Sequence, residues 1–376
     1  MNKVRFVGLD VHADTIAVAV AEPDGEVRAL GTIPNRPDSI RRLVKRLGPP
    51  DRLRMCYEAG PTGYVLYWQL TGLGVPSDVI APTLVPTKAG DRVKTDRRDA
   101  MKLARSYRAG DLTPVWVPDA THEALRDLVR AREAAKKDQL RARHRLGKFL
   151  LRTGRRPPLT MKAWTQQHLR WVKTVQYDHA AQEATLQDYL QEIEHVADRI
   201  ARLEQAIDEA VKSVPDRMRA VIAALQALRG VAQVSAVTMV AELGELSRFA
   251  SARQLMSYTG IVSSEDSSGT RTRRGAITKT GNAHLRRIVV EAAWAYRHRP
   301  GLGAAFHKRQ ATVNPEIKAI AWKAQHRLHT RYRWLMAKGK HKQQVVTAIG
   351  RELLGFIWAI AVKVEAQRSD GQATAA

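Results

Sequence analysis

The amino-acid sequence predicts a mixed α/β domain at the N-terminus, followed by a mostly α-helical remainder. Two observations lead to this prediction. Strand-like and helix-like segments alternate through the first 118 residues, whereas strand signals nearly vanish between Thr121 and Val211. We therefore expect four regions: an α/β domain over 1–118, a helical or coiled-coil region over 119–219, a basic helical domain over 220–368 and a flexible tail over 369–376.

The N-terminal domain is expected to contain a mixed sheet flanked by helices. Apolar runs predict strands at 4–10, 15–21, 26–33, 53–58 and 75–80, and the patterns between them predict helices at 38–47, 62–70 and 94–108. Asp24-Gly25 is a hairpin-turn signal between the second and third strands. This order of elements is typical of a ribonuclease-H-like fold, in which the first and fourth strands are neighbours.

Helical patterns dominate the middle region. Residues 122–151 predict one long basic helix, and Pro157 and Pro158 follow it. From Leu186 the apolar residues keep a heptad-like spacing at Leu190, Ile193, Ala197, Ile200, Leu203, Ile207 and Ala210. This seam is typical of a coiled coil, either within the chain or between two copies, and equally of one face of an ordinary helical hairpin.

The third region begins with a turn signal and continues into a serine-rich loop. Residues 228–236 resemble a helix-hairpin-helix, although Ala232 replaces the usual second glycine, so a plain packing turn is an equal alternative. Short helices are expected next, and then a loop from Gly260 to Gly269. A further helix is expected from about Ala283.

Composition excludes several classes of protein. The hydrophobic fraction of 44% excludes wholesale disorder, and no uninterrupted apolar run approaches a membrane span, so we expect no membrane partner. The single cysteine, Cys56, excludes a disulfide framework and a cysteine-based zinc site. The first residues lack the layout of a signal peptide. We therefore expect a cytoplasmic protein.

The charge points to a polyanionic partner. The chain carries 62 Lys+Arg and 37 Asp+Glu, a net charge of +25. Residues 269–376 hold 21 Lys+Arg and five Asp+Glu, whereas residues 1–100 hold 15 and 12. A folded basic segment of this kind is often a nucleic-acid footprint, the plainer alternative being a solvated basic surface. We expect nucleic-acid binding.

Four carboxylates are candidate metal ligands. Asp10 ends the first predicted strand, Glu58 ends the fourth, and Asp96 and Asp99 lie one helical turn apart. Adjacent strand ends and the start of one helix can bring all four together, and such carboxylates repel one another unless a cation compensates them. Mg²⁺ or Mn²⁺ suits these oxygen ligands and can polarise a phosphodiester. Turn, capping or surface salt-bridge roles are the plainer alternative.

The serine-rich loop is a candidate phosphate site. Ser263, Ser264, Ser267 and Ser268 precede Gly269, and four basic residues follow that we expect to bind nucleic acid, namely Arg271, Arg273, Arg274 and Lys279. Hydroxyls beside guanidinium groups suit phosphate binding, and they also suit a nucleophile whose attack develops negative charge on oxygen. Composition alone favours a loop that clamps the backbone without chemistry.

The chain resembles the DEDD-type transposases of the insertion-sequence one-ten family. In the first half the resemblance rests on residues 8–12 (Gly-Leu-Asp-Val-His), 57–60 (Tyr-Glu-Ala-Gly) and 94–100 (Lys-Thr-Asp-Arg-Arg-Asp-Ala). In the second half it rests on residues 241–244, 249–255, 258–261, 268–269, 274–282 and 284–287. The two motif sets occur in the expected order over nearly the whole chain, and only the middle region lacks a diagnostic motif.

The resemblance implies more than the residues alone. It implies a RuvC-like N-terminal domain with divalent metal at Asp10, Glu58, Asp96 and Asp99, and a C-terminal transposase domain whose serine nucleophile corresponds to Ser268, with Ser267 adjacent. Arg286 and Arg287 fall within the matching motifs and are further candidates for nucleic-acid binding. The family implies donor and target DNA, a bridge RNA as guide, assembly as a dimer or tetramer in which different protomers cooperate, and a location at the nucleoid.

Three functions follow from these expectations. The first is a DNA transposase or recombinase that cuts and rejoins DNA through a phosphoserine intermediate, with divalent metal at the carboxylates. The second is a RuvC-like nuclease of the junction-resolving kind, which uses water as the nucleophile. The third is a nucleic-acid-binding scaffold without catalysis, in which the acidic cluster is structural.

Overall fold

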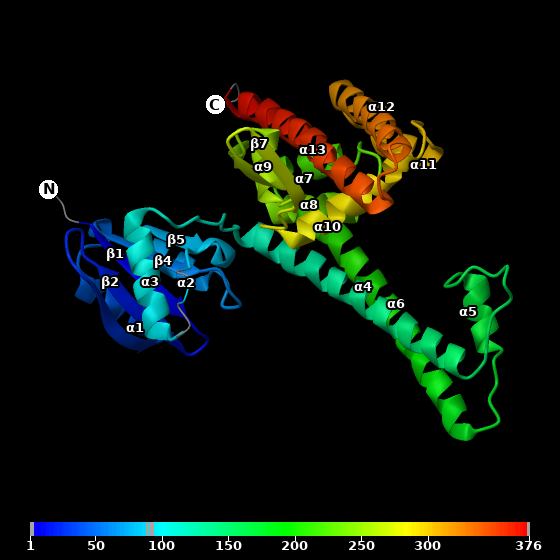
Figure 1. The fold of residues 1–376 in the computed structure, drawn as a ribbon, viewed down its shortest axis with the longest axis horizontal. Coiled ribbons are helices and arrows are strands. Elements are labelled where there is room, and N and C mark those ends of the chain that lie inside the picture. The colour runs from blue at the N-terminus through cyan, green and yellow to red at the C-terminus, as the bar shows by residue number, and fades with distance from the viewer. Residues whose placement is uncertain (1–3, 88–89, 91–93, 374–376) are drawn as a thin grey trace. The chain divides into compact units, whose positions relative to one another are not determined.

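The computed structural model describes residues 4–87, 90 and 94–373. Within it the chain divides into two compact units, residues 1–118 and 119–376, each with its own hydrophobic core. Figure 1 shows a mixed sheet with helices in the first unit and a predominantly helical second unit. The predicted fold class, an α/β domain followed by mostly helical structure, is confirmed.

The sheet of the first unit has the strand order β3-β2-β1-β4-β5. The strands are β1 (Arg5–Val11), β2 (Thr15–Ala21), β3 (Val27–Pro34), β4 (Leu53–Glu58) and β5 (Ser77–Ile80). β1 pairs antiparallel with β2 and parallel with β4, so the first and fourth strands are neighbours. The helices are α1 (Pro37–Leu47), α2 (Val65–Gly72) and α3 (Asp96–Ala109), with short 3₁₀ turns at Pro50–Arg52 and Pro82–Leu84.

Alternation along the strands assigns the helices to the two faces of this sheet. Val7 and Leu9 of β1 pack with the apolar residues of α1 and α2. On the opposite face of β2, Ala17, Ala19 and Ala21 pack with Ala100 and Ala104 of α3. Small side chains on both sides let α3 approach the sheet closely, and this approach positions the acidic first turn of α3.

A long helical hairpin begins the second unit. It consists of α4 (Ala120–Arg152) and α6 (Ala180–Ser213), with α5 (Gln166–Lys173) between them in sequence (Figure 1). The heptad-like seam of α6 packs on α4 of the same chain: Leu186, Leu190 and Ile193 lie in one cluster with Leu146 and Phe149, and Val196 and Ile200 pack with Ala135. The predicted seam is therefore satisfied within the chain.

The remaining helices surround a second, larger core. They are α7 (Asp216–Leu225), α8 (Gln233–Leu243), α9 (Ala252–Tyr258), α10 (Ala283–Ala293), α11 (Ala304–Gln310), α12 (Pro315–Ala337) and α13 (Lys342–Ala373), with 3₁₀ turns at Leu246–Arg248 and Trp294–Arg297. α13 includes residues 369–373, which the sequence assigned to a flexible tail. Residues 374–376 lie outside the described residues.

The turn between α7 and α8 is buried against the core. Ala227, Leu228 and Val231 are fully buried, and Gly230 has a φ of +82°. A Cβ at Gly230 would lie 2.3 Å from the carbonyl oxygen of Ala292 in α10. Because the turn contacts protein on this side, it is better described as a packing turn than as a helix-hairpin-helix that binds phosphate through its backbone amides.

Within α13, residues 342–367 are long and apolar enough to cross a membrane by length and composition. This segment is not an uninterrupted apolar run, because it contains Arg351, Glu352 and Lys363. Half of the most apolar window is buried inside the protein, and Ile349, Leu353 and Ile357 are fully buried in the core of the second unit. The apolarity of α13 is that of a central core helix.

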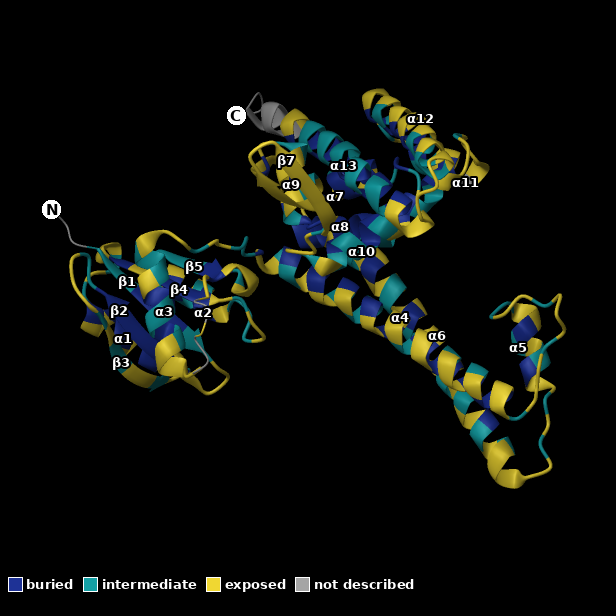
Figure 2. Cartoon of the chain, viewed as in Figure 1, coloured by how far each residue is buried: buried dark blue, intermediate teal, exposed yellow. Residues whose placement is uncertain are grey.

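The serine-rich segment forms an antiparallel β-ribbon instead of the predicted loop. β6 (Ser263–Ser268) and β7 (Arg271–Ile277) pair across a two-residue turn at Gly269-Thr270. Gly269 has a φ of +57°, which primed hairpin turns require and which glycine adopts without strain. Every residue of β6 is exposed, so no apolar alternation marks this ribbon in the sequence (Figure 2).

Candidate active site

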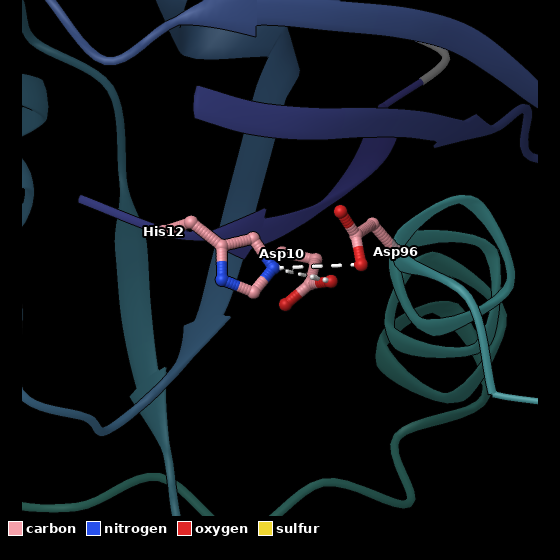
Figure 3. A group of neighbouring side chains, drawn as sticks. All are labelled: Asp10, His12 and Asp96. Atoms are coloured by element: carbon pink, nitrogen blue, oxygen red, sulfur yellow. Dashed lines mark ion pairs between the residues drawn. The ribbon is translucent and has the colours of Figure 1, made fainter. Parts of the chain in front are cut away.

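Asp10, His12 and Asp96 form a compact group in the first unit (Figure 3). One ligand atom from each lies within 4.8 Å of the others, and Nε2 of His12 is 3.5 Å from both Oδ2 of Asp10 and Oδ1 of Asp96. Asp10 is the penultimate residue of β1, whereas Asp96 begins α3 after Thr95, which caps the helix by accepting a hydrogen bond from the Arg98 amide. Strand end and helix start thus meet at this edge of the sheet.

Glu58 and Asp99 lie near this group without joining its closest ligand atoms. Tyr57 pairs with Leu9 in the parallel register of β4 and β1, so Glu58 and Asp10 follow at neighbouring strand ends. Burial raises the pKa of Glu58, and the charges of Asp10 and Asp99 raise it further. The structure therefore gathers all four predicted carboxylates around one edge, with Asp10 and Asp96 in closest approach.

The donor set fits a divalent cation. Burial raises the pKa of Asp10; the charge of His12 opposes this effect, and Asp96 and Asp99 add to it. Mutual repulsion of this kind is relieved when a cation binds. Carboxylate oxygens with one imidazole nitrogen suit Mg²⁺ or Mn²⁺, and nitrogen favours the latter.

Sequence reasoning did not select His12 as a site residue. It stands two positions after Asp10, directly beyond the end of β1, so continuation of the strand alternation by one residue would place both side chains on the same side. The signal was therefore present in the motif of residues 8–12. His12 could therefore have been considered as a ligand in addition to the four expected carboxylates.

Gly8 allows the helix that carries Asp96 and Asp99 to approach β1. A Cβ at this position would lie 2.3 Å from the carbonyl oxygen of Ala100 and 2.4 Å from the amide nitrogen of Ala104. Both atoms belong to the backbone of α3, so they cannot rotate away. The glycine of the Gly-Leu-Asp motif thus sets the distance between the acidic helix start and the strand end at Asp10.

In the second unit, Ser267 and Ser268 lie on opposite faces of the β6–β7 ribbon. Cross-strand pairs place Ser268 with Arg271 and Asp266 with Arg273 on one face. On the other face Ser267 pairs with Thr272, and its hydroxyl donates to Glu265, which also pairs with Arg274. In the described part of the chain the Ser268 hydroxyl has no hydrogen bond, so the two serines differ chemically.

Arg274 pairs with Glu265, and the other five predicted basic residues divide into two groups. Arg271, Arg273 and Lys279 are exposed and have no ion pair within the described residues. Arg286 donates to the carbonyl oxygens of Thr259 and Thr280, and Arg287 pairs with Glu133 and Glu291. These last two side chains, expected to contact nucleic acid, bind groups within the protein instead. No sequence pattern indicates these intramolecular contacts.

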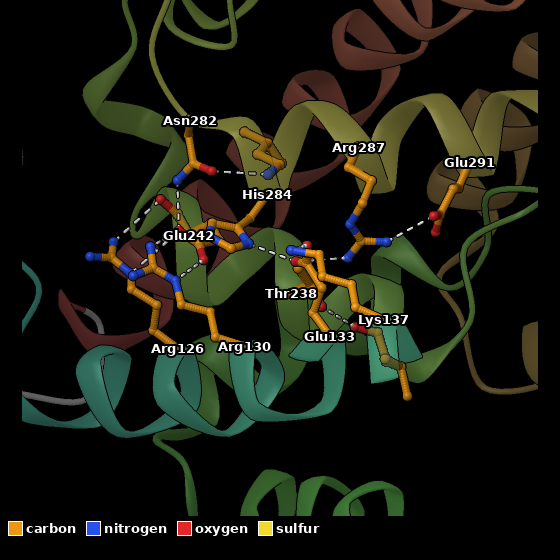
Figure 4. A network of polar contacts seen from close by, with 12 residues as sticks. Arg126, Arg130, Glu133, Lys137, Thr238, Glu242, Asn282, His284, Arg287 and Glu291 are labelled. Atoms are coloured by element: carbon orange, nitrogen blue, oxygen red, sulfur yellow. Dashed lines mark hydrogen bonds and ion pairs between the residues drawn. The ribbon is translucent and has the colours of Figure 1, made fainter. Parts of the chain in front are cut away.

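The segment after β7 is fixed to the helical core. Gly260 and Gly281, both at positive φ, bring the turn after α9 against residues 279–281: a Cβ at Gly281 would lie 2.0 Å from the carbonyl oxygen of Tyr258. Asn282 caps α10 and donates to Glu242 of α8, which Arg126 and Arg130 of α4 also bind (Figure 4). The base of the ribbon is therefore attached to α4, α8 and α9.

Comparison with known proteins gives consistent results along the chain. Residues 222–308 match the description "Transposase IS116/IS110/IS902 family", and residues 7–154 match a DEDD transposase family. The "Putative transposase y4qE" of Sinorhizobium fredii is 45% identical over 359 residues, covering 95% of this chain and 88% of that protein.

Two further relatives extend the comparison. The transposase for insertion sequence element IS1533 of Leptospira borgpetersenii is 32% identical, covering 90% of this chain and 99% of that protein. The "Pilin gene-inverting protein" of Moraxella lacunata is 24% identical, covering 72% and 67%. The comparisons thus match both the N-terminal and the C-terminal motif sets on which the sequence resemblance rests.

Proposed function

Because the chain belongs to the IS116/IS110/IS902 family of transposases, which act on DNA, we propose that it cuts and rejoins DNA through a covalent phosphoserine intermediate, with Ser268 as the nucleophile. The observation that carries the proposal is the position of Ser268 at the exposed tip of the β6–β7 ribbon. Its hydroxyl lies on the face that also presents Arg271 and Arg273.

The proposed step is a transesterification. The hydroxyl oxygen of Ser268 attacks the phosphorus and loses its proton, a P–O bond to deoxyribose breaks, and the displaced sugar oxygen takes up one proton and leaves as a hydroxyl. The guanidinium groups of Arg271 and Arg273 stabilise the charge that develops on the phosphoryl oxygens. Because the phosphoserine bond retains the energy of the phosphodiester, a DNA hydroxyl can reverse the step and rejoin a strand.

We assign the metal to Asp10, Glu58, Asp96 and Asp99, with His12 as an additional ligand. A bound divalent ion would supply charge to orient and polarise the phosphodiester. The assignment is supported by the 4.8 Å grouping of Asp10, His12 and Asp96 and by the mutual effect of the carboxylates on their pKa values. Mg²⁺ and Mn²⁺ are the ions proposed.

Trapping on a denaturing gel tests the serine assignment. DNA spanning the gene and its flanking segments is incubated with the protein and Mg²⁺, and a covalent protein–DNA adduct is expected. Ser268→Ala should abolish the adduct, whereas the matched variant Ser267→Ala should retain it. Cut DNA with no adduct, or an adduct that persists in Ser268→Ala, contradicts the proposal; the first result indicates water as the nucleophile.

We extend the proposal to a bridge RNA and to assembly as a dimer or tetramer at the nucleoid. The charge supports it, because residues 269–376 hold 21 Lys+Arg against five Asp+Glu. RNA that co-purifies with the protein, once sequenced, should contain segments complementary to both donor and target DNA. If protomers cooperate, mixing Asp10→Asn protein with Ser268→Ala protein should restore adduct formation that each lacks alone.

A further inference from the structure

The outer face of α12 carries exposed tryptophans that the fold does not use. Its inner face packs Ile317, Ala321 and Leu328 into the core. Trp322 and Trp334, which point away from this core, are 43% and 45% exposed. Because the inner face already supplies the packing of this helix, large apolar rings on its solvent side indicate a surface that binds something.

A cavity of about 300 Å³ lies between α11 and α12 beside Trp322. Leu302 and Trp322 line it with apolar surface, and His307 and Lys318 are nitrogen-bearing residues of its lining. The volume is at the lower end of the range for small-molecule sites. It suits a flat ring of the size of a nucleobase, with Trp322 as one wall.

The charge around this cavity defines the partner. Residues 297–342 contain 12 Lys+Arg and five of the 12 histidines of the chain. Their one acidic residue is Glu316, which pairs with Lys363 at 2.8 Å. An anionic partner with flat apolar rings satisfies both the charge and the exposed aromatic surface, and an unpaired nucleic-acid strand has this chemistry.

The two tryptophans are not equivalent. The guanidinium of Arg331 and the ammonium of Lys338 lie 4.5 Å and 3.8 Å from the ring centre of Trp334. Trp322 instead meets His326 in a near-perpendicular contact, with ring centres 4.6 Å apart. Cations already cover Trp334, whereas Trp322 both lines the cavity and has no cation over its ring in the described part of the chain.

We propose that the cavity between α11 and α12 binds an unpaired nucleotide, whose base stacks on Trp322 and whose flanking phosphates contact Lys318 and Lys323. This site shares no residue with the β6–β7 ribbon or with the carboxylate group, and nucleotide binding there requires neither metal nor strand cleavage. It reads no base sequence by itself, because every base offers a π-face. Guide RNA and a displaced DNA strand are two sources of the same ligand chemistry.

Binding is measured on full-length Ser268→Ala protein in EDTA, so that failure of the serine chemistry cannot change the result. The probes are fluorescent oligouridylate, oligothymidylate and a DNA duplex of equal length, followed by anisotropy. Trp322→Ala should weaken binding of at least one single strand by about tenfold, because stacking on an aromatic ring contributes at that scale. Duplex binding should be unchanged, and the stronger single-strand probe identifies the source.

Two control variants separate stacking from general effects. Trp68→Ala removes a tryptophan of α2 with the same 43% exposure and should leave all three affinities unchanged. Trp322→Phe should retain most of the affinity, because it keeps an aromatic face. Lys323→Ala should reduce the salt slope by about 0.7, whereas Trp322→Ala should not change it. Unchanged single-strand affinity in Trp322→Ala, or equal loss on duplex, would overturn the proposal.

Discussion

The buried carboxylate of Glu242 accepts a 2.6 Å hydrogen bond from Nδ2 of Asn282. The side-chain oxygen of Asn282 in turn accepts from the Leu285 amide and caps α10. Arg130 binds both oxygens of Glu242 at 2.8 and 2.9 Å. Burial raises the pKa of Glu242, but hydrogen bonds from Arg130 and Asn282 outweigh it and lower the pKa. One ionised residue thus joins α4, α8 and α10.

Removal of this carboxylate should destabilise the second unit strongly. Glu242 is fully buried, and Arg126 beside it is 6% exposed. Glu242→Ala removes the carboxylate that balances the buried charge of Arg126, and breaking a buried ion pair typically costs about 3–5 kcal/mol. Urea denaturation followed by circular dichroism measures the free energy of unfolding. Glu245→Ala is the matched control: Glu245 pairs with Arg217 at 2.9 Å on the surface, and its loss should cost less than about 1 kcal/mol.

Equal effects of the two substitutions would contradict this account. They would mean that the arginines around Glu242 reach solvent or other acceptors when the carboxylate is absent. A variant Glu242→Gln distinguishes charge from size, because glutamine keeps an acceptor for one arginine and removes the negative charge.

A second buried carboxylate predicts how stability changes with pH. Glu133 of α4 contacts His284 at 2.6 Å, Lys137 at 2.8 Å and Arg287 at 3.1 Å (Figure 4). Burial raises the pKa of Glu133, but the bonds from His284, Lys137 and Arg287 lower it to about 2 from its ordinary 4.5. The unfolded chain therefore takes up a proton at higher pH than the folded chain does.

The stabilisation from Glu133 is complete above pH 4.5 and disappears as the pH falls to about 2. Over this interval the loss is about 3 kcal/mol. Unfolding free energies of wild type and Glu133→Gln, measured by urea denaturation between pH 7 and pH 2.5, should converge towards the acid end. Parallel curves over the whole range would show that the ionisation of Glu133 does not contribute in this way.

Much of the first unit was predictable, because its signals are local. Apolar runs defined β1, β2 and β4, and the strand order followed from the order of elements, which brought Asp10 beside Glu58. Thr95 and the residues after it gave the helix start that carries Asp96 and Asp99. The position of His12 beside them depends on the direction of its side chain after β1. The pattern of the four carboxylates does not determine that direction.

The second unit was less predictable for a physical reason. The β6–β7 ribbon is exposed on both faces, so its sequence has none of the alternation by which strands are recognised. Its register, which separates Ser267 from Ser268, follows from the turn at Gly269. Likewise, the roles of Arg286 and Arg287 depend on Thr259 and Glu133, which are distant in sequence.

Gly8→Ala should disturb both stability and metal binding in the first unit. The added methyl group would meet the backbone of α3 at Ala100 and Ala104, so the helix must move away from β1 and take Asp96 with it. Overpacking of this kind costs about 1–3 kcal/mol. Thermal unfolding measures the stability, and Mn²⁺ titration followed by electron paramagnetic resonance measures the affinity.

Gly72→Ala serves as the control for this substitution. Gly72 ends α2, and a Cβ there has no neighbour within 4 Å, so stability and Mn²⁺ affinity should be unchanged or slightly improved. If Gly8→Ala also left Mn²⁺ affinity unchanged while α3 moved, the distance between Asp10 and Asp96 would not determine metal binding.

The imidazole of His12 should bias the metal site towards ions that accept nitrogen ligands. Nε2 lies 3.5 Å from the oxygens of both Asp10 and Asp96, within reach of an ion held between them. Mg²⁺ is a hard ion that prefers oxygen ligands, whereas Mn²⁺ is a transition-metal ion and accepts imidazole nitrogen more readily. His12→Ala should therefore weaken Mn²⁺ binding by about tenfold and Mg²⁺ binding by less. Isothermal titration calorimetry of the DNA-free protein measures both affinities.

Two control variants accompany this test. Asp10→Asn should weaken the binding of both ions together, and His144→Ala, an exposed substitution on α4, should change neither affinity. An equal loss of both ions in His12→Ala would mean that the side chain orients Asp10 and Asp96 through its contacts with them instead of binding the ion.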